Sequence, residues 1–325
     1  MTPEIPILIA GTGELTKQNH PHDQWLPVLP GTGLRATGIW VPDAASAAER
    51  ARCERLADDW ALPLRGGAPD LAGVRGVLSC LDGPARTQLL RAAEIAGVAV
   101  LQDKPTLDST ASLRESAAAA PGVRLLIADH PREHPSAARL LSAIAAGEIG
   151  LLRSMHLDLV VTDGDGPCPV GELSNLLVYQ LGLLSRATGP GTAQARAVRH
   201  ESAAGRESWS VLGQTHRDVV FGLHLSRTDT GAGQPETLVN RIRAGGSHGS
   251  MSADLTGPAL TVRRPGAVVR HPFGPSSVTE LLGRFHAMLS QGAPGQGWTD
   301  TLHLAQNRDE LARSASSDQL AQLAW

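Results

Sequence analysis

Short hydrophobic runs alternate with amphipathic stretches through the first 128 residues. The apolar runs are typical of strands buried on both faces and cover residues 5–10, 37–41, 75–81, 98–101 and 124–128. Between them, apolar or small side chains recur at helical spacing over residues 44–60, 84–96 and 109–120. Gly97 stands where the end of a helix favours glycine. Strands that alternate with helices through short linkers predict a doubly wound parallel sheet.

The pattern changes after residue 128. A helix is predicted over 136–146, and segments with a period of two follow at 152–161, 209–225, 236–243 and 251–264. Such alternation predicts an open, mostly antiparallel sheet with one covered face. Amphipathic helices are expected at 173–187, 278–290 and 298–314.

A chain of 325 residues exceeds the size at which one hydrophobic core usually keeps growing. We therefore expect an α/β protein of two domains. Residues 1–128 form an N-terminal Rossmann domain for dinucleotide binding. Residues 129–325 form a C-terminal α+β domain for substrate binding and oligomerisation, whose last helices are able to pack back on the first domain.

Composition excludes several classes of partner. The net charge of -3 and the absence of any Lys/Arg block argue against nucleic acid and against a membrane surface. No stretch approaches the ~20 apolar residues that span a bilayer, and residues 1–10 do not resemble a secretion signal. The three cysteines contain no CxxC pair, which argues against a disulfide framework or a zinc site. We expect a cytoplasmic protein that binds no metal.

A glycine turn follows the first predicted strand. Gly11-Thr12-Gly13 permits a tight turn and a close approach to a pyrophosphate, with Glu14 and Leu15 continuing the loop. The third small residue of the dinucleotide fingerprint is missing, because Thr16 occupies its place, and Pro21 interrupts the helix expected next. A plain turn between a strand and a loop is therefore the alternative interpretation.

An acidic residue, Asp43, follows the second predicted strand. A carboxylate at that place accepts hydrogen bonds from the adenosine ribose hydroxyls and repels a 2′-phosphate, which favours NAD over NADP. Asp43 is equally suited to be the N-cap of a helix that opens at Ala44.

The chain has only two lysines, and one of them follows a predicted strand in Asp103-Lys104-Pro105. Ligands of open α/β sheets bind at this edge, where a partly desolvated Lys104 is suited to handle a substrate proton beside a nicotinamide ring. An exposed lysine paired with Asp103 or Asp108 is the structural alternative. After the strand at 75–81, further candidate cofactor residues are Leu81, Asp82 and Arg86.

Several of these motifs occur in a known order. Gly11-x-Gly13, Asp43, Asp103-Lys104-Pro105, Arg132-x-x-Pro135 and Gly147-x-Ile149-Gly150 together resemble the glucose-fructose oxidoreductase, inositol dehydrogenase and MocA (Gfo/Idh/MocA) family. The resemblance runs over essentially the whole chain. It implies an NAD(P)-dependent dehydrogenase or reductase with Lys104 as the catalytic lysine. It also implies a homo-oligomer, a dimer or tetramer, in which a neighbouring subunit covers an apolar face of the open sheet.

The helix at 173–187 departs from that family. Asn175 stands where the family has an acid, Tyr179 stands where it has the catalytic histidine, and Gly182 replaces a second aspartate. Asn175 and Tyr179 are four residues apart and share one helix face, so both are candidates for catalysis and substrate binding. The phenol of Tyr179 can donate a proton, or it can serve as the anchor of a half-buried helix residue. Arg86 and Asp82 replace a histidine and a proline of the family.

Two polar residues follow the last predicted strand of the first domain. Arg132 and His134 are candidates for binding substrate, and solvated loop residues are the alternative interpretation for each. The spacing of His130 and His134 occurs in metal sites, but Pro131 and Pro135 interrupt the helix that such a pair needs.

These observations predict an oxidoreductase that uses NAD, with NADP as a possibility. It would transfer a hydride to or from a small polar molecule such as a sugar derivative, cyclitol or hydroxy compound. One alternative is a C=N reductase similar to the thiazolinyl imine reductases, which also lack the usual histidine pattern. Another is a non-redox, catalytically silent relative that binds a dinucleotide.

Overall fold

The computed structural model describes residues 3–12, 21–103, 109–163, 172–201, 207–229, 237–256, 259–264, 266–272 and 276–325. The chain divides into two compact units. The first contains residues 1–129 and 278–302, and the second contains residues 130–277 and 303–325. Each unit has its own sheet.

The first unit contains the predicted parallel sheet. Its strands are β1 (Ile5–Ala10), β2 (Leu34–Trp40), β3 (Leu64–Arg65), β4 (Gly76–Ser79), β5 (Ala99–Gln102) and β6 (Leu125–Ile127). Every pair is parallel, and the spatial order is β3-β2-β1-β4-β5-β6. This order is that of the doubly wound dinucleotide-binding fold. The expected Rossmann-type sheet is confirmed, with β3 as a strand that the sequence pattern did not predict.

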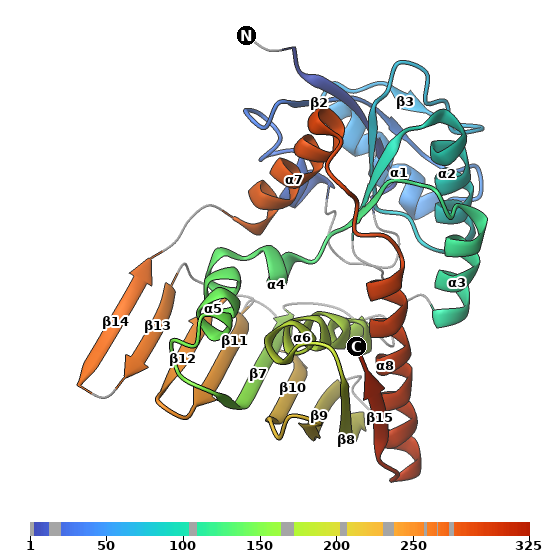
Figure 1. Cartoon of the computed structure of the whole chain (residues 1–325). Coiled ribbons are helices and arrows are strands. Elements are labelled where there is room, and N and C mark those ends of the chain that lie inside the picture. The colour runs from blue at the N-terminus through green and yellow to red at the C-terminus, as the bar shows by residue number, and fades with distance from the viewer. Residues whose placement is uncertain are drawn as a thin grey trace. The chain divides into compact units, whose positions relative to one another are not determined.

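Helices cover both faces of this sheet, as expected where strands are apolar on both sides. Along β1, Ile7 and Ile9 pack on one face with α1 (Ala47–Asp59) and α7 (Ser277–Gln291), while Leu8 packs on the other face with α2 (Gly83–Ala96). Next to α2 lies α3 (Thr110–Ala119) (Figure 1). The predicted end of α2 is confirmed, because Gly97 is its C-cap in the left-handed conformation.

The connection from β1 to β2 differs from a regular βαβ unit. Its described part contains the five-residue π-helical segment η1 (Pro21–Trp25), and Trp25 is fully buried. The same face of the sheet is filled by α7, from far along the chain, through Leu281, Phe285 and Met288. Because the ring of Phe285 lies against β4, a Cβ on Gly76 would be 2.8 Å from its Cζ. Gly76 therefore lets α7 approach the sheet closely.

The second unit contains the mixed, mostly antiparallel sheet that was expected. In its described part the spatial order is β14-β13-β12-β11-β7-β10-β9-β8-β15. The strands are β7 (Leu152–Asp163), β8 (Thr192–Glu201), β9 (Glu207–Thr215), β10 (Val220–Asp229), β11 (Thr237–Gly246), β12 (Gly249–Asp254), β13 (Ala259–Arg264), β14 (Ala267–Pro272) and β15 (Ala321–Ala324). Only β7 and β10 pair in parallel within these described strands.

Two predicted strands are in fact hairpins. The segment 209–225 contains β9, a turn and β10, and the segment 251–264 contains β12 and β13. The first turn was missed because it has no glycine: Asp218 adopts the left-handed conformation with φ +59°. Asp is one of the few side chains that tolerate this conformation. The strands β8, β14 and β15 were also not predicted.

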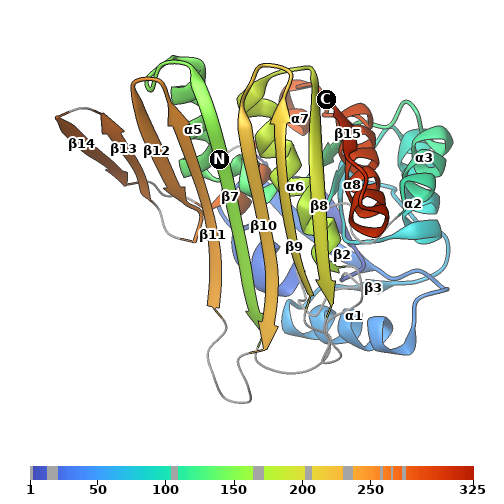
Figure 2. The ribbon, with the colours of Figure 1, turned by 90° about the horizontal axis from the view of Figure 1, so that it is seen from below.

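Helices of the second unit lie on one face of its sheet (Figure 2). They are α4 (His130–Glu133), α5 (Pro135–Ala145), α6 (Glu172–Thr188) and α8 (Thr299–Ser317), of which α8 begins in the first unit. The opposite face of the sheet turns toward the viewer in Figure 2. Val198, Leu212 and Val220 are exposed and adjoin the buried Ala197, Val211 and Phe221 along their strands, so they belong to this opposite face. In the described residues, no helix combines the length and apolar character needed to cross a bilayer.

Candidate functional site

The carboxyl ends of the parallel strands gather the candidate residues of the first unit. Gly11 and Thr12 follow β1, Asp43 follows β2, and Asp103 follows β5. Because β1 lies between β2 and β4, the strand order reverses beside it. Ligands of doubly wound sheets bind outside the carboxyl ends at such a point. This edge is therefore the candidate site.

Gly11 gives the edge its shape. Its φ is +69°, and a Cβ at this position would lie 2.5 Å from Cδ2 of Leu81. Both the conformation and the close approach exclude a larger residue. The turn after β1 therefore lies directly against the loop that follows β4.

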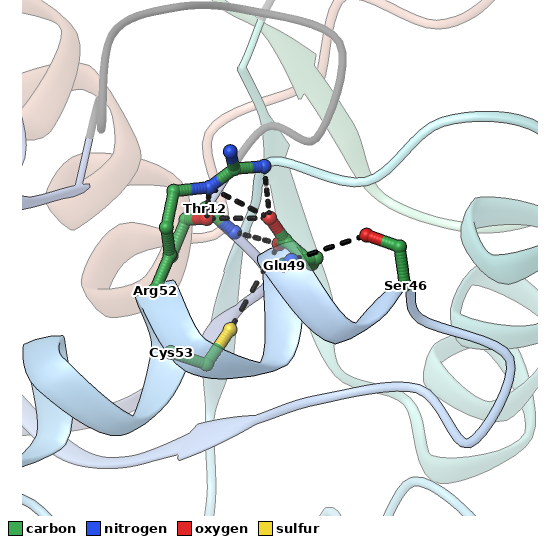
Figure 3. Close-up of polar contacts among 5 residues, drawn as sticks. All are labelled: Thr12, Ser46, Glu49, Arg52 and Cys53. Carbon is green, nitrogen blue, oxygen red and sulfur yellow. Dashed lines mark hydrogen bonds and ion pairs between the residues drawn. The ribbon is translucent and has the colours of Figure 1, made fainter.

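Thr12 is held by a buried carboxylate (Figure 3). Its N–H donates to Oε1 of Glu49 and its hydroxyl donates to Oε2, both at 2.6 Å. Thr12 has no exposed surface and Glu49 is 2% exposed. A buried carboxylate needs such donors to offset its lost hydration.

Arg52 supplies the opposite charge. Its Nη2 lies 2.8 Å from Oε2 of Glu49, and its Nε donates to the same oxygen at 3.3 Å and to the hydroxyl of Thr12 at 3.2 Å. The ion pair and the Thr12 donors together satisfy the carboxylate, which is the condition under which a buried charge is tolerated. The end of β1 is thereby tied to α1.

Neither Glu49 nor Arg52 was singled out by the sequence. Ser46 is the N-cap of α1 and accepts from the N–H of Glu49 at 3.1 Å. Ser46-Ala-Ala-Glu49 has the capping-box pattern, in which the glutamate is expected to return to the cap residue. The pattern marks the start of the helix, but the carboxylate is directed to Thr12. The contact between Glu49 and Thr12 could therefore not be predicted from the local sequence around Glu49, because the two residues are 37 positions apart.

Asp43 is not the N-cap of α1. The helix begins at Ala47 with Ser46 as its cap, so the alternative interpretation of Asp43 is wrong. The side chain is exposed, and Oδ1 accepts from the N–H of Gly67, beyond β3, at 3.0 Å. Asp43 thus remains on the surface of the carboxyl edge.

A side-chain amide joins the ends of β4 and β5. Nε2 of Gln102 donates to the carbonyl of Leu81 at 3.0 Å and to the carbonyl of Asp103 at 3.1 Å. Asp103 is buried, and its Oδ2 lies 3.8 Å from Sγ of Cys80. Asp82 occupies the N-cap position of α2 without a side-chain cap hydrogen bond. Gln102 therefore fixes the backbone immediately before Lys104.

Two buried cysteines flank this edge. Burial, followed by the charge of Glu49, raises the pKa of Cys53 to about 12. Burial, followed by the charge of Asp103, raises the pKa of Cys80 well above its ordinary value. Because a thiolate is the nucleophilic form, neither cysteine has the properties of a reactive group at neutral pH.

Arg86 lies inside the first unit. It has no exposed surface, and its Nη2 donates to Oγ of Ser116 on α3 at 3.0 Å. The hydroxyl of Thr87 lies 2.8 Å from the same Oγ. Arg86 thus links α2 to α3.

Five predicted site residues lie outside the described part of the chain: Gly13, Glu14, Leu15, Lys104 and Pro105. Asn175 lies on α6, but its side chain is also outside what the structure describes. Tyr179, on the same helix, is half-buried. Within the described residues, no group of His, Cys, Asp and Glu has the arrangement of a metal site.

The two polar candidates of the second unit have local partners. Nε of Arg132, on α4, lies 3.3 Å from Oε1 of Glu133. His134 is the N-cap of α5, and its Nδ1 accepts from the N–H of Ser136 at 3.2 Å. Burial lowers the pKa of His134 below 6.5 despite the opposing charge of Asp254. The cap requires a neutral imidazole with Nδ1 unprotonated.

Comparison with known proteins identifies the fold. No family model and no curated protein matches the sequence. Among solved structures, an aldose-aldose oxidoreductase from Caulobacter crescentus, complexed with glycerol, has a TM-score of 0.77 at 16% identity, covering 98% of this chain and 100% of that chain. An oxidoreductase from Agrobacterium radiobacter, in complex with NAD+, L-tartaric acid and magnesium, has a TM-score of 0.74 at 15% identity, covering 98% of each chain.

A myo-inositol dehydrogenase from Corynebacterium glutamicum has a TM-score of 0.71 at 14% identity, covering 99% of each chain. At these identities the similarity is one of fold. The chain has the fold of Gfo/Idh/MocA-type oxidoreductases, which confirms at this level the resemblance predicted from Lys104-Pro105 and Gly147–Gly150.

Proposed function

We propose that this protein is an NAD(P)-dependent oxidoreductase, with NAD as its cofactor, that transfers a hydride to or from a small polar molecule. The observation that carries the proposal is the placement of Gly11, Asp43 and Asp103 at the carboxyl ends of β1, β2 and β5. Structures of the same fold have been crystallised with NAD+, as in the Agrobacterium oxidoreductase.

The described residues fit a dinucleotide. Gly11 takes a left-handed turn and packs against Leu81 so closely that a Cβ would not fit, and this turn ends β1 at the edge where a doubly wound sheet binds its nucleotide. The exposed carboxylate of Asp43 is suited to accept from the ribose hydroxyls and disfavours a 2′-phosphate. We propose that Asp43, Leu81, Asp82 and Asp103 line the cofactor site and that Thr12 contributes to it by holding the end of β1 in place. Gly13, Glu14, Leu15, Lys104 and Pro105 are proposed to complete the site.

When bound, nicotinamide supplies the hydride chemistry. In our proposal the ammonium of Lys104 holds and transfers the proton at the reacting oxygen, since Gln102 anchors the backbone on its N-terminal side. Tyr179 is the second proton donor, and Asn175 orients the substrate from the same helix face. Arg132 and His134 are proposed to bind substrate.

The proposed substrates are sugar derivatives, cyclitols or other hydroxy compounds. The support comes from proteins of the same fold: the Caulobacter enzyme is named an aldose-aldose oxidoreductase, and the Corynebacterium enzyme is named a myo-inositol dehydrogenase. The side chains proposed for the substrate, from Arg, His, Asn and Tyr, are hydrogen-bonding groups suited to hydroxyls.

Two measurements test this function. Addition of NADH should quench the intrinsic fluorescence of the protein, and the absence of any effect with either NADH or NADPH would overturn the proposal. Turnover is then followed by NADH absorbance with a panel of polyols, aldoses and cyclic imines. Reaction with polyols or aldoses supports the proposal, reaction with imines alone favours the C=N reductase, and binding without turnover favours a silent relative.

We further propose that the protein is cytoplasmic and assembles as a dimer or tetramer, with a domain boundary at residue 128. Exposed apolar side chains at Val198, Leu212 and Val220 on the second sheet support the assembly. Light scattering at micromolar concentration tests it, and a monomer would contradict it.

A further inference from the structure

The guanidinium of Arg52 has hydrogen bonds at two of its nitrogens and an available third nitrogen. Its Nε and Nη2 are committed to Glu49 and Thr12, as described above. Within the part of the chain that the structure describes, its Nη1 has no hydrogen-bond partner, and the side chain is 24% exposed. In Figure 3 the terminal nitrogen without a dashed line points away from Glu49. Two N–H donors of a fixed cation are therefore available to a ligand.

The position of Arg52 indicates which ligand it meets. Its hydrogen bond to Thr12 places it beside the first described residues of the glycine turn, at the end of β1. The helix that carries it follows β2 and Asp43. Arg52 therefore lies on the side of the sheet where a dinucleotide places its adenosine half and its phosphates.

A phosphate bound at the end of β1 needs hydrogen-bond donors, and here the backbone N–H of Thr12 is not free to be one of them. Backbone N–H groups at a helix N-terminus commonly receive the pyrophosphate, but the N–H of Thr12 already donates to Glu49. A guanidinium is the side chain best matched to phosphate oxygens.

We propose that Nη1 of Arg52 donates to a phosphate group of the bound dinucleotide and that Glu49 positions the guanidinium for this contact. The inference rests on the proposed function, because it assigns a residue to the same site. Two phosphate groups of a dinucleotide could accept this hydrogen bond. One is the pyrophosphate common to NAD and NADP, and the other is the 2′-phosphate of NADP.

The test compares the dissociation constants of NADH and NADPH for the wild type, Arg52→Gln and Arg55→Gln. Arg55 is an exposed arginine on the same helix and provides the matched control. Loss of a charge-assisted hydrogen bond should weaken binding by about 10- to 100-fold in Arg52→Gln, while Arg55→Gln binds as the wild type. Weakening of both nucleotides identifies the pyrophosphate, and weakening of NADPH alone identifies the 2′-phosphate.

Unchanged binding of both nucleotides to Arg52→Gln would overturn the inference and leave the proposed function intact. If the wild type binds neither nucleotide, the proposed function itself has failed. These two failures are therefore distinguishable in one set of titrations.

Arg52→Gln also leaves the Glu49 carboxylate without its cation, so a second variant is needed. In Glu49→Gln/Arg52→Gln both charges are removed. Persistent weak binding supports the phosphate contact, whereas recovery of wild-type affinity would show that uncompensated Glu49 caused the loss and would overturn the inference.

Adenosine, measured by competition, gives a readout without phosphate. Its affinity should be equal in the wild type and Arg52→Gln. An equal loss of adenosine and NADH binding would indicate a distorted edge and would contradict the proposal.

Discussion

The carboxylate of Glu49 accepts both hydrogens that Thr12 can donate, the N–H at Oε1 and the hydroxyl at Oε2. The two residues are 37 positions apart in the sequence. The hydrogen-bond donors of Thr12, at the end of β1, therefore have a partner within the protein and need no ligand. Thr12 is thus held in place before any ligand binds, which reduces the ordering cost at this residue.

Replacing Glu49 with alanine should strongly destabilise the first unit. The buried N–H of Thr12 loses its acceptor and the guanidinium of Arg52 loses its counter-ion, which together cost about 3 kcal/mol. Urea unfolding followed by far-UV circular dichroism measures the change. Glu54→Ala, at an exposed position of the same helix, is the control and should change stability by less than about 0.5 kcal/mol. A similar small effect at Glu49 would contradict the prediction.

The cap of α5 should make stability depend on pH. Because burial lowers the pKa of His134 below 6.5 in the folded protein, the unfolded chain binds the proton more readily. Stability should therefore fall as the pH decreases through 6.5 and level off below the folded-state pKa. His134→Asn retains a capping side chain that does not titrate. The difference in unfolding free energy between wild type and variant should change from pH 8 to pH 5, and a constant difference would refute the prediction.

Lys104→Met should lower kcat far more than it lowers the affinity for NADH. Removing a group that transfers a proton typically lowers kcat by about 10²- to 10⁴-fold. NADH affinity should fall by a much smaller factor, because Lys104 is one of several residues proposed to line the cofactor site. Lys104→Arg keeps the charge but replaces the compact ammonium with a planar fork, so it should recover little activity. Wild-type kcat in Lys104→Met would remove this residue from the mechanism.

The native protein should protect two of its cysteines. Cys53 and Cys80 are buried with raised pKa values, so a Cys168→Ser variant should not react with a thiol reagent at pH 8. The same variant unfolded in urea should show two reactive thiols. Rapid labelling of the folded variant would show that one of these side chains is accessible.

Gly76→Ala should loosen the packing of α7. A Cβ there would lie 2.8 Å from Cζ of Phe285 and 2.9 Å from Cδ1 of Leu289. Overpacking of this kind costs about 1–3 kcal/mol. Gly283→Ala is the matched control, because it lies within α7 with no neighbour near its Cβ and should stabilise the helix by about 0.5–1 kcal/mol. If both substitutions stabilise the protein, the close contact is absent.

Regular alternation made the first unit predictable. Apolar strands such as 5–10 and 98–101 are separated by helices, so the order of elements and the edge that carries Asp43 and Asp103 followed from the sequence. Gly97 marked the end of α2 because glycine readily adopts the left-handed conformation found there.

Features that depend on distant parts of the chain were not predictable in the same way. Glu49 looks like a capping-box residue, and its partner Thr12 is revealed by the folded structure. The turn at Asp218 carries no glycine signal, and β15 joins β8 across more than 100 residues of sequence. In each case the local pattern permits several outcomes and a tertiary contact selects one.

The origin of α7 has a consequence for biosynthesis. Leu281, Phe285 and Met288 complete the core on the α7 side of β1 and β4, yet they are translated after strands β7 to β14 of the second sheet. A nascent chain that ends near residue 129 therefore exposes the apolar surface that these side chains later cover. The first unit should therefore stay incomplete until α7 has emerged from the ribosome.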